Sequence, residues 1–307
     1  MQNNDNIKIK NCQINIDNQA FVKISRQGND YLEITHTMRE QQGTVKKIDK
    51  DNYLVIKTGE VKSYNKDKEK TKTNDNLKKT FARLRELIRN NFSKNSKNQL
   101  FITLTYKENM TDEKRLMKDF ENFYKRLKRY MKGHKLDYLA VAEPQGRGAW
   151  HFHLMLKSDQ EELYIDNIEM ERLWRQGYTQ TERLKSNDVG SYYVAYFTDI
   201  LEENKNKNDK KRIKGSRLQY YPKGFRFYRK SKGIVEPKEN IEYYDIEKLE
   251  KNGYEKVFEK GYEIVIEDKQ TTHIVNRIKK EVWKRVHKGQ KPKNVYKKRV
   301  KNRKEKG

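Results

Sequence analysis

The sequence predicts an α+β fold, in which an antiparallel sheet carries helices and a basic extension follows at the C-terminal end. Three observations support this prediction. Runs of β-branched and aromatic residues, typical of buried strands, alternate with amphipathic helical patterns in the middle of the chain. The resulting order of elements is β-α-β-β-α-β-α. The excess of positive charge is greatest near the C-terminal end.

The overall composition indicates a soluble protein that binds a polyanion. The 307 residues include 70 Lys and Arg against 44 Asp and Glu, which gives a formal net charge of +26. Nucleic acid is the commonest partner of such a charge. A single cysteine, Cys12, excludes a disulfide framework and a cysteine-rich zinc site. No stretch approaches the ~20 apolar residues of a membrane span, so we expect no membrane partner.

Changes in composition predict four parts of the chain. Residues 1–75 alternate weakly and are expected to form a β-rich extension and a linker. Residues 76–237 hold the strongest helical and strand patterns and form a central domain. Residues 238–275 are expected to form a β-hairpin extension, and residues 276–307 a basic tail.

The basic tail carries half of the excess charge of the chain. From Arg277 to Lys306 there are 15 Lys or Arg residues against two Glu. Such a run cannot bury enough apolar surface to fold alone. It is therefore either a solvated segment or an arm that binds nucleic acid. We expect a final helix over residues 274–287, at its start.

Each element of the central domain follows from a local pattern. Apolar residues at three- and four-residue spacings predict a helix over residues 76–92. The run LFITLTY predicts a buried strand over residues 100–106, and Thr111 is the expected N-cap of the next helix. The remaining predictions are strands over residues 138–143, 150–156, 178–184 and 224–228, a helix over 163–174 with Gly177 as C-cap, and a helix over 189–203 capped by Asn187 or Asp188.

The first six of these elements match the split βαβ arrangement, which is ferredoxin-like or RRM-like. In this arrangement the first and third strands are neighbours at the centre of an antiparallel sheet. We expect helices on one side of the sheet and the last helix, which carries several tyrosines, packed over it.

Two histidines lie one residue apart in the most apolar strand. Because side chains alternate along a strand, His151 and His153 point to the same face. With Glu143 from the preceding strand they can bind one divalent cation and leave positions for phosphate oxygens, which suits Mg²⁺ or Mn²⁺. The register remains open, since strict pairing places Glu143 opposite Trp150, whereas a seven-residue loop or a bulge places it opposite His151.

The last helix of the central domain contains three tyrosines. Tyr192 and Tyr196 are four residues apart and share one face, and Tyr193 points about 100° away. Aromatic residues at helical spacing usually belong to a core. A phenol is also a nucleophile toward phosphorus when a metal polarises the phosphate, and the product is a phosphotyrosine ester.

Taken together, these motifs resemble the HUH endonucleases and, more narrowly, the rolling-circle replication initiators of phages and plasmids. The order of the motifs agrees with this family, and the resemblance covers about residues 76–237. The motifs are FITLTY at residues 101–106, Glu143, GAWHFHL at residues 148–154, and VGSY at residues 189–192 with Tyr196.

The resemblance implies that this chain is a metal-dependent enzyme that nicks and closes DNA. Glu143, His151 and His153 then match the metal ligands of the family, with Mg²⁺ or Mn²⁺ as the cofactor. The enzyme would cut one DNA strand at a specific sequence and keep its 5′ end as a phosphotyrosine, which starts rolling-circle replication.

Tyr192 matches the nucleophile of the family, and Tyr196 falls where two-tyrosine members hold a second nucleophile. Many relatives have a lysine three residues after the first tyrosine, where this chain has Ala195. A shifted alignment would make Tyr193 the first nucleophile.

The resemblance also implies partners and a location. These are single-stranded or cruciform origin DNA, a host polymerase and helicase, and the cytoplasm of a bacterial host. We expect contacts with DNA phosphates from Arg147, Lys230, Lys232 and Arg299. Two alternatives remain open, namely a non-catalytic protein that binds origin DNA and an HUH nickase that serves mobilisation or transposition.

Overall fold

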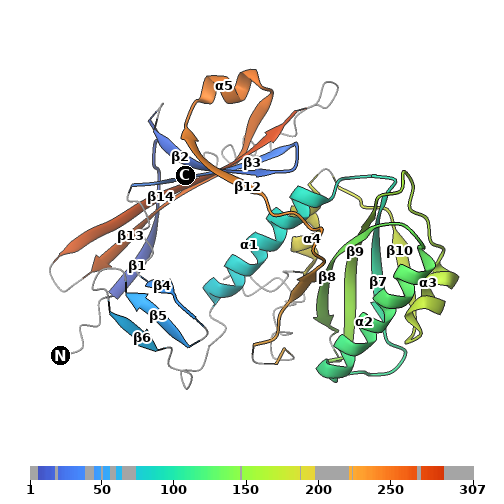
Figure 1. Ribbon diagram of the computed structural model, residues 1–307. Coiled ribbons are helices and arrows are strands. Elements are labelled where there is room, and N and C mark those ends of the chain that lie inside the picture. The colour runs from blue at the N-terminus through green and yellow to red at the C-terminus, as the bar shows by residue number, and fades with distance from the viewer. Residues whose placement is uncertain are drawn as a thin grey trace, which may run out of the picture. The chain divides into compact units, whose positions relative to one another are not determined.

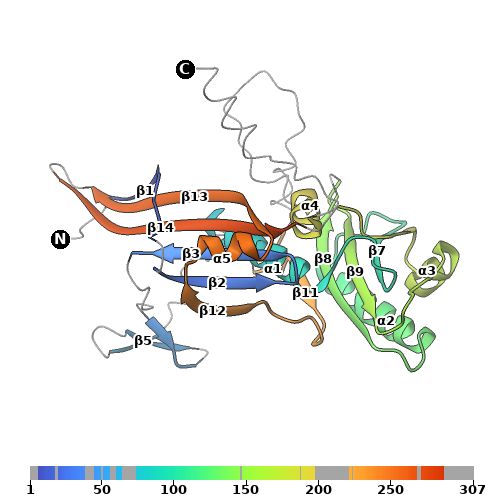
Figure 2. The same ribbon diagram turned by 90° about the horizontal axis from the view of Figure 1, so that it is seen from above.

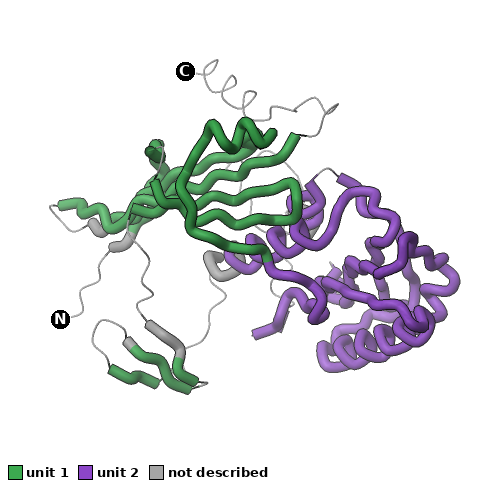
Figure 3. Tube along the Cα trace, turned by 45° about the horizontal axis from the view of Figure 1, so that its top comes forward, with its two compact units in different colours: residues 1–69, 237–307 green, residues 70–236 purple. Residues whose placement is uncertain are grey.

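The chain forms two compact units, and we describe each one by itself. One unit comprises residues 1–69 and 237–307, and the other comprises residues 70–236 (Figure 3). The computed structural model describes residues 6–17, 20–38, 45–49, 51–55, 60–63, 74–145, 147–186, 188–197, 221–222, 224–267 and 271–286.

The unit of residues 70–236 is built on a five-stranded antiparallel sheet with the strand order β10-β7-β9-β8-β11. The first and third strands of the predicted arrangement, β7 and β9, are therefore neighbours at the sheet centre, as expected. This confirms the α+β fold class. The strands are β7 (Gln99–Thr105), β8 (Leu136–Pro144), β9 (Trp150–Ser158), β10 (Thr179–Glu182) and β11 (Tyr228–Lys230).

Helices lie on both sides of this sheet, α2 and α3 on one side and α1 and α4 on the other (Figures 1 and 2). The amphipathic pattern of α2 accounts for its packing, because the ring of Phe120 lies 4.6 Å from that of Phe152 on the sheet. The helices are α1 (Asn74–Asn91), α2 (Glu113–Tyr130), α3 (Asn167–Trp174) and α4 (Val189–Phe197).

Two of the predicted helix caps are wrong. The backbone N–H groups of Lys114 and Arg115 donate to Asp112, so Asp112 is the N-cap of α2 in place of Thr111. At the end of α3 the C-cap is Arg175, which has a left-handed φ of 65°, and Gly177 lies beyond it. Gly177 is required for another reason.

The chain at Gly177 passes very close to the end of β7. Its φ is +151°, and an added Cβ would lie 2.6 Å from the carbonyl oxygen of Thr105 and would also collide with the backbone nitrogen of Lys107. Only glycine allows this approach and this backbone conformation.

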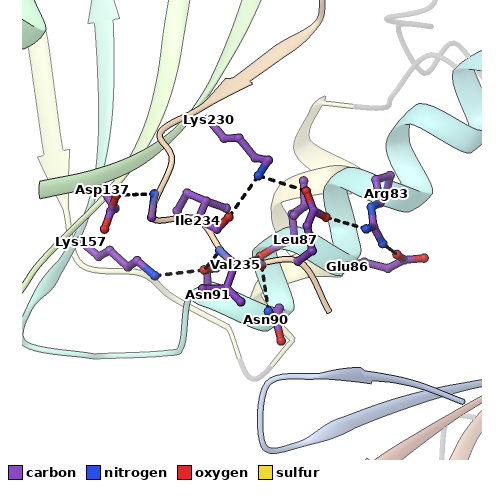
Figure 4. Close-up of polar contacts among 12 residues, drawn as sticks. Arg83, Glu86, Leu87, Asn90, Asn91, Asp137, Lys157, Lys230, Ile234 and Val235 are labelled. Carbon is purple, nitrogen blue, oxygen red and sulfur yellow. Dashed lines mark hydrogen bonds and ion pairs between the residues drawn. The ribbon is translucent and has the colours of Figure 1, made fainter. Parts of the chain in front are cut away.

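The chain that follows β11 is held between α1 and the sheet (Figure 4). The Asn91 side chain at the end of α1 donates to the carbonyl of Val235 and accepts from its N–H and from Lys157 of β9. Asp137 of β8 accepts from the N–H of Gly233. These contacts fix the C-terminal end of α1 to the sheet. The strand expected over residues 224–228 forms only as the short edge strand β11.

The other unit contains a six-stranded antiparallel sheet with the order β1-β13-β14-β3-β2-β12. Strands from both ends of the sequence alternate in it, and one face buries an apolar cluster that includes Ile34 and Trp283. Residues 45–63 form a separate three-stranded sheet, β4-β5-β6. The elements are β1 (Asn6–Cys12), β2 (Phe21–Gln27), β3 (Tyr31–Thr37), β4 (Val45–Lys47), β5 (Asn52–Val55), β6 (Val61–Ser63), β12 (Lys238–Tyr243), α5 (Ile246–Lys251), β13 (Tyr254–Glu267) and β14 (Thr272–Arg285).

The helix predicted over residues 274–287 is wrong, because this segment is strand β14. The first residues of the predicted basic tail, 276–285, are thus part of a sheet. Ile278 and Val282 have helical spacing, but the alternate positions are also buried, and one of them is the carboxylate of Glu281. Glu281 accepts hydrogen bonds from Tyr244 and Trp283, so a buried charge hid the strand period. No helix among the described residues is long and apolar enough to cross a membrane.

Candidate active site

The register of the β8–β9 hairpin determines the face on which Glu143 lies. Pro144 pairs with Trp150 across a five-residue turn, and Glu143 therefore pairs with His151. Of the two registers left open by the sequence, the structure has the one that places this carboxylate on the face of His151 and His153.

Glu143, His151 and His153 bring three ligand atoms together. Oε2 of Glu143 lies 3.3 Å from Nε2 of His151 and 3.1 Å from Nε2 of His153, and the two nitrogens are 3.1 Å apart. An octahedral ion with ligand distances of about 2.1 Å holds adjacent ligands about 3 Å apart. The triangle therefore has the size of one face of a coordination shell, and these residues fit a divalent metal ion.

The environment of this metal-ligand triad keeps the carboxylate charged. Burial raises the pKa of Glu143, but hydrogen bonds from His151 and His153 outweigh this effect and hold its pKa well below its usual range. The side chain of His153 is 1% exposed and that of His151 is 12% exposed. The triad is thus enclosed at its inner end and reaches solvent at the outer one.

Two residues that the sequence analysis missed contact the outer ring nitrogens of the histidines. Oγ1 of Thr103 lies 3.3 Å from Nδ1 of His153, and the amide of Gln145 lies 3.5 Å from Nδ1 of His151. Such partners orient metal-ligating imidazoles. Thr103 pairs with His153 in the β7–β9 register, so the two-residue period of the FITLTY run could have identified it.

Helix α4 packs on the histidine face of the sheet. The ring of Tyr193 lies 4.4 Å from that of Phe101, which stacks on His153 at 5.7 Å. Tyr193 is only 3% exposed, whereas Tyr192 is 48% exposed with its ring 4.9 Å from that of Tyr193. Tyr193 is thus a packing residue between helix and sheet, and Tyr192 is accessible. The backbone of Tyr196 is in α4, but its side chain lies outside the described residues.

Helix α1 fixes the start of α4. The guanidinium of Arg89 donates from Nε and Nη2 to the two oxygens of Asp188 at 2.9 and 2.6 Å, and from Nη2 to Oγ of Ser191. Asp188 also accepts from the N–H of Ser191, so it caps α4, as one of the two predicted caps; Asn187 lies outside the described residues. Gly190 allows close contact, because a Cβ there would lie 2.7 Å from the carbonyl oxygen of Arg85.

The contact between Arg89 and Asp188 predicts a pH dependence of stability. Burial raises the pKa of Asp188, but Arg89 lowers it more, so the pKa is below its ordinary value. The stabilisation is present above the unfolded pKa of about 3.9 and is lost as the pH falls through the lower folded pKa. We expect the unfolding free energy to fall between pH 5 and pH 3 by about 1 kcal/mol more in wild type than in Asp188→Asn. Urea unfolding at the two pH values measures this, and equal losses would contradict it.

The four residues expected to contact DNA lie in different settings. Arg147 is exposed in the β8–β9 turn and donates to Gln145, next to His151. Lys230 in β11 pairs with Glu236 and donates to a backbone carbonyl, and Lys232 is exposed in the following turn. Arg299 lies outside the described residues. Only Arg147 is thereby brought near the metal-ligand triad.

Comparison with known proteins identifies the central part of the chain. Residues 99–200 match a family model of replication-associated proteins, the ORF2 family. The match begins at β7 and includes the metal-ligand triad and the three tyrosines. No curated protein and no solved structure is significantly similar to this chain. The resemblance seen in the sequence motifs is confirmed, and residues 99–200 belong to the ORF2 family of replication-associated proteins, which is of the rolling-circle Rep type.

Proposed function

We propose that this protein is a metal-dependent DNA nicking and strand-transfer enzyme that initiates rolling-circle replication. The observation that carries the proposal is the triad of Glu143, His151 and His153 on the sheet face that also packs α4, where Tyr192 is exposed. A metal site and an accessible phenol on one face are what phosphoryl transfer to tyrosine requires.

The three ligands would hold Mg²⁺ or Mn²⁺, which supplies Lewis-acid polarisation of the scissile phosphate. The Tyr192 oxygen attacks phosphorus and loses its proton to solvent. A tyrosine–phosphorus bond forms while the bond from phosphorus to the 3′ oxygen breaks, and this oxygen takes up a proton. The 5′ end is then covalently attached and the 3′-OH is free for a host polymerase. Because the phosphoester is retained, rejoining requires no ATP.

The burial of the two neighbouring tyrosines favours Tyr192 over Tyr193 as the first nucleophile. Tyr193 is enclosed between Phe101 and its own helix, so its attack on a DNA phosphate would require the helix to unpack. Tyr196 remains the expected second nucleophile. Ala195 stands where many relatives have lysine, so phosphate positioning falls to other cations, of which Arg147 beside Gln145 is the nearest described candidate.

The substrate class that fits the charge of the chain is single-stranded or cruciform origin DNA. Exposed Lys232 and the basic run that includes Arg299 would contact its phosphates. The chain contains no Gly-x-x-x-x-Gly-Lys-Ser/Thr motif. A host helicase would therefore unwind the duplex, in the cytoplasm of a bacterial host.

The test is covalent capture of DNA on the protein. Single-stranded oligonucleotides tiled over the gene and its flanks are incubated with Mn²⁺ and separated on a denaturing gel. We expect a protein–DNA adduct that carries a 3′ label and lacks a 5′ label, because the tyrosine retains the downstream fragment. Tyr192→Phe should give no adduct, whereas Tyr193→Phe, which keeps the packed ring, should give one.

Each other outcome has a definite meaning. An adduct that persists in Tyr192→Phe and disappears in Tyr193→Phe or Tyr196→Phe would show that the tyrosine register is wrong. Binding without an adduct in any metal would refute the proposal in favour of a non-catalytic protein that binds origin DNA.

A further inference from the structure

The C-terminal half of α2 and the turn after it are unusually basic. Residues 125–135 contain six Lys or Arg and no Asp or Glu. Five of the six have exposed side chains, and we call these five the α2 basic patch: Lys125, Lys128, Arg129, Lys132 and Lys135.

The charges of the α2 basic patch are not neutralised by acidic side chains. Among the described residues, none of the five forms an ion pair, although Arg129 donates to a backbone carbonyl. The N-terminal half of the same helix differs, because Arg115 pairs there with Glu108 and Asp119. The helix dipole favours cations in the last turn, but this accounts only for Lys128 and Arg129.

Helix α3 adds further positive charge beside this patch. Arg126 reaches from α2 to donate to the carbonyls of Leu173 and Trp174 at the end of α3. Burial and then the neighbouring charges of Arg175 and Arg129 lower the pKa of Arg126, which places Arg175 close to the patch. Like charges held together in this way oppose folding, and a polyanion would relieve this repulsion.

The α2 basic patch lies on the far side of the sheet from the metal-ligand triad. The buried face of α2 contacts Phe152, which alternates with His151 and His153 along β9 and so points to the opposite face. A sheet and a helix together are about 20 Å thick. A phosphate bound to the metal ligands therefore cannot also contact this patch.

We propose that the α2 basic patch, with Arg175, binds the phosphate backbone of duplex DNA that flanks the nick site. This inference rests on the proposed function. Duplex fits better than single-stranded DNA, because single-strand binding relies on several aromatic rings that stack on bases. In residues 125–135 the one exposed ring is Tyr130. Charges spread over about 15 Å of helix and turn suit contacts to several phosphates without sequence readout.

The experiment compares two triple variants of the full chain. Lys125→Gln/Arg129→Gln/Lys132→Gln neutralises the patch. The control Lys238→Gln/Lys248→Gln/Lys251→Gln removes the same charge from exposed lysines of the other unit. Fluorescence anisotropy with a labelled duplex of about 25 base pairs is measured from about 50 to 200 mM KCl, without divalent metal. We expect the patch variant to bind at least about tenfold more weakly at about 100 mM KCl, with a salt slope lower by about 2 to 3. The control should remain within about twofold of wild type.

Adduct formation on a short single-stranded oligonucleotide separates this inference from the proposed function. We expect the patch variant to form adduct within about twofold of the wild-type rate. Loss of that adduct would overturn the inference, since the patch would then hold the cleaved strand. Unchanged duplex binding, or equal weakening in the control, would also overturn it. Absence of adduct in wild type would refute the nicking function, while the duplex comparison would still decide the role of the patch.

Discussion

Glu143→Gln is expected to abolish metal binding and to slow adduct formation on the order of 10³-fold, which is about 4 kcal/mol of barrier. The substitution keeps the size of a buried side chain and removes the negative charge that the three ligand atoms direct at a cation. Calorimetric titration with Mn²⁺ should detect one site per wild-type chain and none in the variant, and EDTA should reproduce the loss of activity in wild type.

His134→Ala is the matched control for the metal prediction. This histidine also lies beside a carboxylate, Asp159, but it is exposed and lies outside the metal-ligand triad. We expect its Mn²⁺ affinity and adduct rate to equal those of wild type. If Glu143→Gln bound Mn²⁺ as tightly as wild type, the triad would not be the metal site.

Gly190→Ala is expected to cause the largest loss of activity among changes outside the metal ligands and tyrosines. The added methyl would overlap the Arg85 carbonyl oxygen and the side chain of Arg89, so α4 must move away from α1. We expect about 2 kcal/mol of lost stability. Tyr192 is two residues further along the helix, and a displacement of about 1 Å at a reacting group costs about 100-fold in rate.

The comparison for this prediction is Ser191→Ala. It removes one hydrogen-bond acceptor of Arg89 and adds no volume, so we expect a loss of stability of about 1 kcal/mol and an adduct rate within about tenfold of wild type. Rate and oligonucleotide affinity are measured below the melting temperature of each variant. Gly190→Ala should lower the rate and leave the affinity unchanged. A Gly190→Ala variant with wild-type melting temperature and rate would show that α1 does not position α4.

Much of the central unit could be predicted from local patterns. The run of residues 100–106, the amphipathic helix with Phe120 on its buried face and the His-x-His strand each have a clear period, and they form the expected strand order. The wrong predictions concern positions where local preference competes with tertiary packing. Gly177 resembles a helix cap but serves a close approach of two backbones, and the residues of β14 have helical spacing by coincidence.

The other unit could be predicted less well, because its sheet joins distant parts of the sequence. Strand β1 pairs with β13, and β3 pairs with β14. No local period specifies such partners, since a strand pattern shows which face is buried and not which strand lies beside it. The buried Glu281 adds to the difficulty, because its partners Tyr244 and Trp283 lie on separate elements.

By itself the sequence determined which chemical groups this protein presents, namely two imidazoles on one strand face, an acid before the turn and tyrosines on one helix. These are consequences of periods of two and 3.6 residues, which need no knowledge of the rest of the chain. Only the tertiary structure decided that Glu143 faces His151, that Tyr193 is buried while Tyr192 is exposed, and that Arg89 holds the start of α4. The physical reason is that register, burial and ion pairing depend on contacts between residues far apart in the sequence, and these contacts form when the whole unit packs.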